Sequence, residues 1–143
     1  MPYAIANIYG NHLASNLYGT IKLYPWHQGT LVQTEIFNLP INQNKSLFFG
    51  FHLHEGNTCE NNFKKVGGHY NPTNQQHPLH AGDLPPLLSN NSGYAYAVIY
   101  TERFKPSEVI NCVFIIHQNP DDFRTQPSGD SGPMIACGVI EKI

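Results

Sequence analysis

The chain alternates short runs of apolar, β-branched and aromatic residues with clusters of glycine, proline and asparagine. Runs of this kind, bounded by turn-forming residues, are typical of β-strands. We expect seven strands, at Ala4–Tyr9, Leu17–Tyr24, Leu31–Phe37, Leu47–His54, Tyr94–Thr101, Asn111–His117 and Ala136–Ile140. An eighth, short strand is expected between Phe63 and Pro86 or near Asp83–Leu88. Since no long helical stretches separate these strands, we predict an all-β fold, an eight-stranded Greek-key β-barrel or sandwich with long loops.

The interval between Glu55 and Asn91 does not fit a plain barrel, because it contains little strand signal. Loops longer than about 12–15 residues are uncommon in compact domains unless they carry function. We therefore expect this loop to hold the functional part of the molecule, ordered by bonds other than a hydrophobic core.

Alternation along two of the predicted strands places histidines opposite the core. In the strand that ends at His54, the apolar residues Phe51 and Leu53 take one face, while His52 and His54 take the other. At the end of another strand, His117 lies on the face opposite Ile116. We expect these three imidazoles to meet on the outer wall of the barrel.

The long loop adds three more histidines and one aspartate, His69, His77, His80 and Asp83. Three imidazoles and a carboxylate can close a tetrahedral zinc site, the arrangement of a structural ion. The three histidines of the barrel wall suit copper, which heads the affinity order of the divalent metals. If His69 used both ring nitrogens, it would serve two ions at once.

Length and composition bound the alternatives. The chain has 143 residues, so we expect a single domain over 1–143. A charged fraction of 13% and a net charge of -2, without a basic run, argue against nucleic acid as a partner. The apolar runs are too short to span a membrane. The opening Met1-Pro2-Tyr3 lacks the features of a signal peptide, which leaves a cytoplasmic protein and a mature exported form as alternatives.

Several motifs, in this order, resemble those of the copper/zinc superoxide dismutase family over essentially the whole chain. They are Gly50-Phe51-His52-Leu53-His54-Glu55, Gly67-Gly68-His69-Tyr70-Asn71-Pro72, His80-Ala81-Gly82-Asp83-Leu84-Pro85, Ile115-Ile116-His117 followed by Asp121-Asp122, and Ala136-Cys137-Gly138-Val139-Ile140. The resemblance implies a superoxide dismutase, which converts superoxide to dioxygen and hydrogen peroxide by alternate reduction and oxidation of copper.

The same resemblance assigns roles to individual residues. Copper would be held by His52, His54, His69 and His117. Zinc would be held by His69, His77, His80 and Asp83. His69 would bridge the two ions and carry a proton, and Asp121 would orient His52 and His77. Cys59 and Cys137 would form a disulfide. Apart from the resemblance, aromatic residues such as Tyr18, Tyr24 and Trp26 could cover an interface, so a homodimer is one possible assembly.

One position departs from the family pattern. The family usually has an arginine before the segment Ile135-Ala136-Cys137-Gly138, and this chain has Met134 there. Loss of a charge-assisted hydrogen bond to the superoxide anion is worth about 1.5–3 kcal/mol, or roughly 10- to 100-fold in rate. Arg124, in the same loop, is a candidate substitute as anion guide.

Two further functions remain as alternatives. A non-enzymatic copper- or zinc-binding protein on the same scaffold would explain Met134. A zinc hydrolase also uses an H-x-H element, but here Glu55-Gly56-Asn57 follows that element. No open zinc position or general-base carboxylate stands out beside the ligands, so the hydrolase is the weaker alternative.

Overall fold

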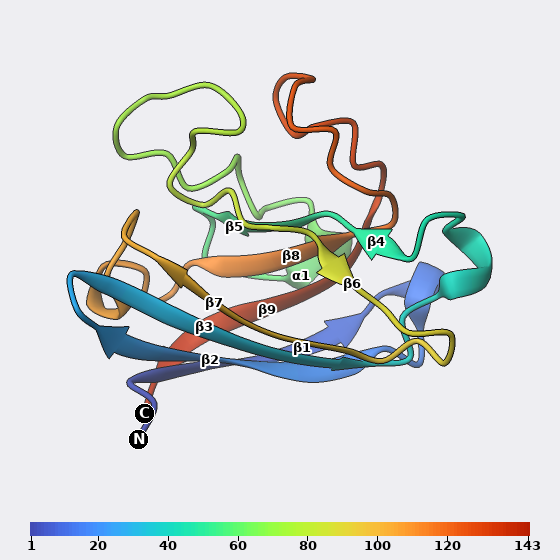
Figure 1. The fold of residues 1–143 in the computed structure, drawn as a ribbon, viewed down its shortest axis with the longest axis horizontal. Helices are drawn as coiled ribbons and strands as arrows, with labels where there is room; N and C mark the ends of the chain where they lie inside the picture. The colour runs from blue at the N-terminus through green and yellow to red at the C-terminus, as the bar shows by residue number, and fades with distance from the viewer.

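A computed structural model describes all residues of the chain, 1–143, and strands form its framework (Figure 1). The strands are β1 (Ala4–Gly10), β2 (Tyr18–Trp26), β3 (Gly29–Phe37), β4 (Phe48–Phe49), β5 (Phe51–His54), β6 (Leu87–Leu88), β7 (Ala95–Thr101), β8 (Val113–His117) and β9 (Met134–Lys142). The short helical elements are η1 (His12–Ala14), η2 (Ile41–Gln43), α1 (Glu60–Phe63) and η3 (Pro106–Glu108). No helix has the length and apolar character needed to cross a membrane.

Seven strands form one antiparallel sheet in the order β5-β8-β9-β1-β2-β3-β7, and β4 pairs with β6 in a second, two-stranded sheet. β3 lies beside β7 rather than beside the next strand in sequence, which is a Greek-key crossover. The sheet curls so that its two ends approach each other (Figure 1). Because β4 leads into β5 and β6 leads toward β7, the β4–β6 pair connects the two ends. The predicted Greek-key β-barrel or sandwich is confirmed.

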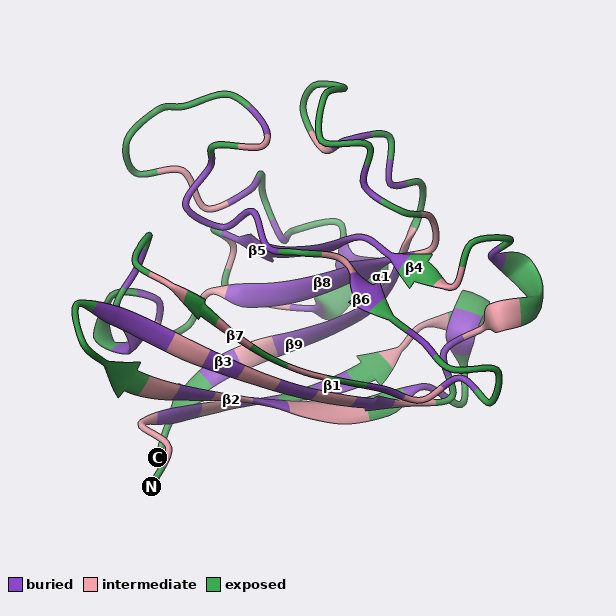
Figure 2. Ribbon diagram, viewed as in Figure 1, coloured by how far each residue is buried: buried purple, intermediate pink, exposed green.

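Alternation along the strands fills the interior with apolar side chains. Phe51 and Leu53 of β5 and Phe114 and Ile116 of β8 belong to one buried cluster, which includes residues from most of the strands. Phe51 and Phe114 stack with ring centroids 5.5 Å apart. β8 and β9 are buried along most of their length, whereas the tips of the loops are exposed (Figure 2). β5 and β8, in which every residue is buried, are therefore the most enclosed strands of the framework.

The predicted strand Leu47–His54 is wrong in one respect, because it is interrupted at Gly50 and forms the separate strands β4 and β5. At the interruption Gly50 N–H donates to the Asn119 carbonyl at 2.8 Å. A Cβ atom at position 50 would lie 2.6 Å from the Ser131 Oγ. The glycine thus admits the loop that follows β8 against the edge of β5, and the strand count rises to nine.

The other predicted strands are present with ends shifted by up to a few residues. The eighth predicted strand corresponds to the two residues Leu87–Leu88. The last strand starts at Met134, two residues before the predicted start at Ala136. This earlier start brings Met134 into the register of β8, opposite His117.

A disulfide between Cys59 and Cys137 ties the long loop to β9, with the two Cα atoms 5.9 Å apart. Both sulfurs belong to a small buried cluster on the outer face of the β8–β9 pair, together with Phe63, Val66 and Ile115. Cys112 is free and half-buried. The predicted pairing is confirmed, and it links residues 78 positions apart.

We expect the double substitution Cys59→Ala with Cys137→Ala to lower the free energy of unfolding by about 2–5 kcal/mol, because the unfolded chain loses a constraint on a long loop. Chemical denaturation measures this change. Amide hydrogen exchange at Glu55 and Gly56, whose N–H groups donate within the tethered loop, should accelerate in parallel. Cys112→Ala is the matched control. An equal loss in that control would mean that the stabilisation comes from packing and not from the cross-link.

Candidate metal centre

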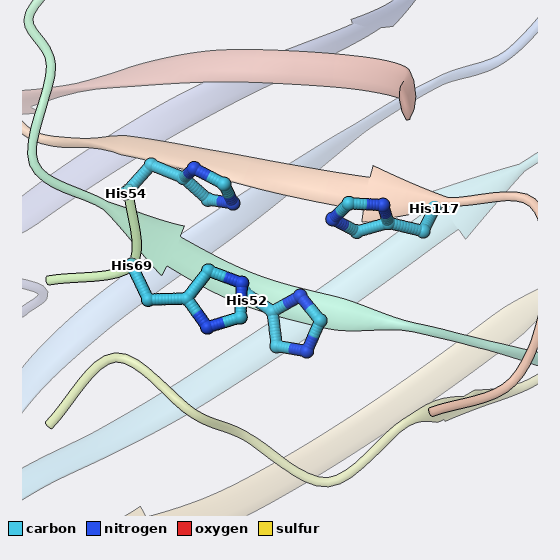
Figure 3. Close-up of side chains that lie close together, drawn as sticks. All are labelled: His52, His54, His69 and His117. Carbon is cyan, nitrogen blue, oxygen red and sulfur yellow. The ribbon is translucent and has the colours of Figure 1, made fainter. Parts of the chain in front are cut away.

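The outer face of the β5–β8 pair carries three histidines where the sheet is covered by loops. His52 pairs in register with Ile115, His54 with Val113, and His117 ends β8 (Figure 3). All three are buried, with relative exposures of 0%, 3% and 3%. The expectation that they project away from the core is correct, but the wall from which they project is covered and not open to solvent.

The long loop folds back along β5 and places two more polar residues beside these histidines. Leu53 N–H donates to the Gly82 carbonyl, and Tyr70 N–H donates to the Leu53 carbonyl, both at 2.8 Å. Isolated bridges consequently align His54 with His69 and His52 with Asp83. The His69 ring lies against the His52 ring with centroids 4.1 Å apart (Figure 3).

One set of four imidazoles has ligand atoms within 4.8 Å of one another, and its members are His52, His54, His69 and His117. Each of the four has one buried ring nitrogen with no hydrogen-bond partner. These atoms are His52 Nδ1, His54 Nε2, His69 Nε2 and His117 Nε2. A buried polar atom left without a partner costs about 1–3 kcal/mol, so four together indicate a missing ligand. A metal ion that accepts nitrogen ligands would satisfy all four.

Hydrogen bonds on the far side of the rings fix which nitrogen is free. His54 Nδ1 lies 2.9 Å from the Gly67 carbonyl, and His117 Nδ1 lies 3.0 Å from the Gly132 carbonyl. Carbonyl oxygens only accept, so the rings donate from Nδ1 and keep a lone pair on Nε2. His52 has the opposite arrangement, because its Nε2 lies 2.8 Å from Asp121 Oδ2.

A second set of ligand atoms surrounds Asp83. His69 Nδ1 lies 2.7 Å from Asp83 Oδ1, and His77 Nδ1 lies 3.1 Å from the same oxygen. His80 Nδ1 lies 3.0 Å from Asp83 Oδ2 and 3.1 Å from His69 Nδ1. Three imidazole nitrogens and a carboxylate thus converge, as a tetrahedral zinc site requires.

His52 also lies near this second set, since one of its ligand atoms falls within 4.8 Å of those of His69, His77 and Asp83. That grouping omits His80. We assign His80 to the second set because its Nδ1 directly contacts both His69 and Asp83. Nδ1 is the ring nitrogen of His52 that has no hydrogen-bond partner, and we therefore assign it to the four-imidazole set.

Asp121 connects the two sets from behind. Its Oδ2 accepts from His52 Nε2 and its Oδ1 from His77 Nε2, each at 2.8 Å. Gly129 makes room for this carboxylate, because a Cβ there would lie 1.9 Å from Oδ1 and the residue has a φ of +75°. The side chain of Asp121 is fully enclosed, with 1% exposure. One carboxylate therefore orients one ring of each set.

Two residues that hold the second set in place were not predicted from the sequence. Gln126 accepts from the backbone N–H of His77 and donates from its own amide to the His77 carbonyl, at 2.9 and 2.8 Å. The Arg103 guanidinium donates to the carbonyls of Pro78 and His80, both at 3.0 Å. These partners are 49 and 23 to 25 positions apart, so no local pattern could have identified them.

Burial controls the protonation of the histidines. It lowers the pKa of His54 to about 3 and that of His117 to about 4, and it also lowers the pKa of His52. Burial alone would raise the pKa of Asp121, but hydrogen bonds from His52 and His77 outweigh it and hold that pKa at about 2. Neutral rings and an ionised carboxylate are the forms that bind metals.

A hollow of about 510 Å³ opens onto the four-imidazole set. His54, His69, His117 and Met134 are among its lining residues, which include one acid, Glu55, and no lysine or arginine. Arg124 is exposed and does not line this hollow, and its backbone N–H donates to Asp122 Oδ1. Its role as an anion guide stays a prediction.

Comparisons with known proteins agree with this geometry. The family model for copper/zinc superoxide dismutase matches residues 17–140. The chain is 30% identical over 138 residues to copper-zinc superoxide dismutase 1 of Aquifex aeolicus. The aligned region covers 86% of this chain and 79% of that protein. It is 37% identical over 120 residues to the copper-zinc superoxide dismutase of Legionella pneumophila, covering 79% and 71%.

Solved structures are similar over nearly the whole chain. The copper/zinc superoxide dismutase of Brucella abortus matches with a TM-score of 0.80 at 26% identity, covering 96% of this chain and 99% of that one. A double mutant of a superoxide dismutase-like protein from Bacillus subtilis matches with a TM-score of 0.81 at 27% identity, covering 94% and 95%. The chain belongs to the copper/zinc superoxide dismutase family, whose cofactors are copper and zinc.

We expect the metal-free protein to lose stability as the pH falls below about 6.5. His54 and His117 have lowered pKa values in the folded state, so between pH 6.5 and about 3–4 the unfolded chain binds more protons. Stability therefore rises with pH in this window. Asp121, held at a pKa of about 2, adds a further loss between about pH 3.8 and 2.

Unfolding midpoints of the metal-free protein between pH 7 and 4 measure the effect. His54→Asn with His117→Asn should flatten the pH dependence, whereas His27→Asn, at an exposed position, should leave it unchanged. A parent protein whose stability does not vary over this range would contradict the expectation.

Proposed function

We propose that the protein is a superoxide dismutase with one copper and one zinc ion per chain. The supporting observation is the convergence of four buried ring nitrogens that lack any partner, beside a second group of three imidazoles and a carboxylate. The two groups share His69, whose Nε2 faces the first and whose Nδ1 faces the second. An ion in the first group would satisfy Nε2, which has no hydrogen-bond partner, and an ion in the second group would bind Nδ1, which lies 2.7 Å from Asp83 Oδ1.

In this proposal the copper ligands are His52 Nδ1, His54 Nε2, His69 Nε2 and His117 Nε2. The zinc ligands are the Nδ1 atoms of His69, His77 and His80 together with the carboxylate of Asp83. All-imidazole ligation suits copper, and the closed set with a carboxylate suits a structural zinc. Asp121 and the Gly67 and Gly132 carbonyls orient the rings from behind.

Copper held by these residues would supply the redox chemistry, in which one superoxide is oxidised to dioxygen and a second is reduced to hydrogen peroxide. The residues of the protein position the copper and the substrate and supply a proton. His69 Nε2 would hold either copper or a proton, and in the protonated state it would donate that proton to the peroxide product, with the second proton coming from solvent, while Nδ1 would stay on the zinc side. The hollow lined by His54, His117 and Met134 admits the small anion.

Protein reconstituted with copper and zinc should accelerate superoxide decay well above the rate that chelated copper gives. Stopped-flow or pulse-radiolysis decay with excess EDTA makes this measurement, because EDTA suppresses loosely bound copper. His117→Asn should abolish the excess rate by removing one of the nitrogens, and His27→Asn, an exposed histidine outside the site, should not. A loaded parent protein no faster than the His117 variant would end the proposal.

Met134 stands where the family usually has an arginine, and the hollow contains no cation. We expect Met134→Arg to raise the rate by roughly 10- to 100-fold, through one charge-assisted contact with superoxide. The gain should shrink as ionic strength rises. The rate of Arg124→Gln tests whether Arg124 guides the anion instead. A loss of rate in Arg124→Gln without a gain in Met134→Arg would assign the role to Arg124.

A second candidate is a metal-binding protein without enzymatic turnover on the same scaffold. The lining of the hollow favours it, because it includes Glu55 and no lysine or arginine that would attract an anion to the copper ligands. This candidate predicts stoichiometric binding of both metals and no excess rate in the assay above.

A further inference from the structure

Met134 is held on the same face of the sheet as the copper-site histidines. In the β8–β9 pair, Ile116 pairs with Ala136 and His117 pairs with Met134, so the register shifts by one residue between these pairs. Both Ile135 and Ala136 are fully buried in the main core. This irregularity returns Met134 to the outer face, directly across from His117.

Both the backbone and the side chain of Met134 contact neighbouring residues. Its carbonyl accepts from Asn11 Nδ2 at 3.0 Å, and its half-buried side chain packs against the small cluster around the disulfide. The same side chain lines the hollow together with His54, His69 and His117. Directly paired positions on neighbouring strands hold their Cβ atoms about 4.5–5.5 Å apart, a distance that a methionine thioether spans. The pairing with His117 and the shared hollow thus place Met134 beside the copper-site histidines.

We propose that the Met134 thioether is a supplementary ligand that favours the cuprous over the cupric ion at this site. The inference rests on the proposed copper site. A thioether is a soft, neutral donor, and such donors select Cu⁺, whereas imidazoles accept both oxidation states. It is also the only donor of this kind in the hollow, where Ser128, Asn71 and Asn74 offer oxygen or nitrogen.

The consequence is a copper site with a raised reduction potential. An arginine at this position would attract anions and would not contact a cation. Met134 instead stabilises the reduced ion, so the protein retains Cu⁺ under reducing conditions. A thioether in place of a cation at this position therefore favours retention of copper over attraction of anions.

Met134→Leu removes the sulfur and keeps a similar apolar volume. With zinc already bound, anaerobic titration of Cu⁺ against bicinchoninate should show about tenfold weaker binding in the variant, while Cu²⁺ affinity against a chelator changes little. The copper reduction potential should fall by about 59 mV for each tenfold change in relative affinity. X-ray absorption of the Cu⁺ form should show a sulfur neighbour in the parent protein alone.

The possible outcomes separate this inference from the proposed function. Equal Cu⁺ affinities and equal potentials for the parent and Met134→Leu, with copper bound to both, would overturn the inference and leave the dismutase proposal standing. A parent protein that binds no copper, with zinc present, would overturn both. Unchanged zinc content in Met134→Leu serves as the control for folding.

Discussion

The backbone pairing between β5 and the loop that follows it determines where the metal centre lies. β5 has β8 on one side, and its other edge would be open if the loop did not cover it. Hydrogen bonds from Leu53 to Gly82 and from Tyr70 to Leu53 cover that edge. The same bonds align His69 with His54 and Asp83 with His52. The same hydrogen bonds therefore cover the edge of β5 and bring the proposed ligands together.

The arrangement of the histidines suits metal binding but lowers the stability of the metal-free fold. Five buried ring nitrogens lack partners, and burial keeps His54 and His117 neutral at physiological pH. Each unpaired atom opposes folding until a ligand arrives. The Cys59–Cys137 cross-link offsets part of this deficit by tethering the loop to β9. Metal binding supplies the rest, so folding of the loops and loading of the ions are coupled.

Much of the framework could be predicted from local pattern. Alternation in β5 and β8 correctly separated core residues such as Leu53 from the histidines, since side-chain period in a strand is a local property. The interruption at Gly50 could not be predicted, because its cause is the approach of Asn119 and Ser131 from a distant loop. The placement of Met134 depends on a register shift between β8 and β9, which is likewise a tertiary property. Gln126 and Arg103 form hydrogen bonds with the backbone of His77 and His80 from distant positions in the chain. No periodicity in the sequence indicates such contacts.

Anomalous diffraction from crystals grown with both metals tests the proposal that the His69 ring is shared between two ions. Data at the copper and zinc absorption edges locate each element separately. We expect a copper peak bonded to His69 Nε2 and a zinc peak bonded to Nδ1 of the same ring. A single ion, or two ions with the His69 ring bonded to only one of them, would contradict it.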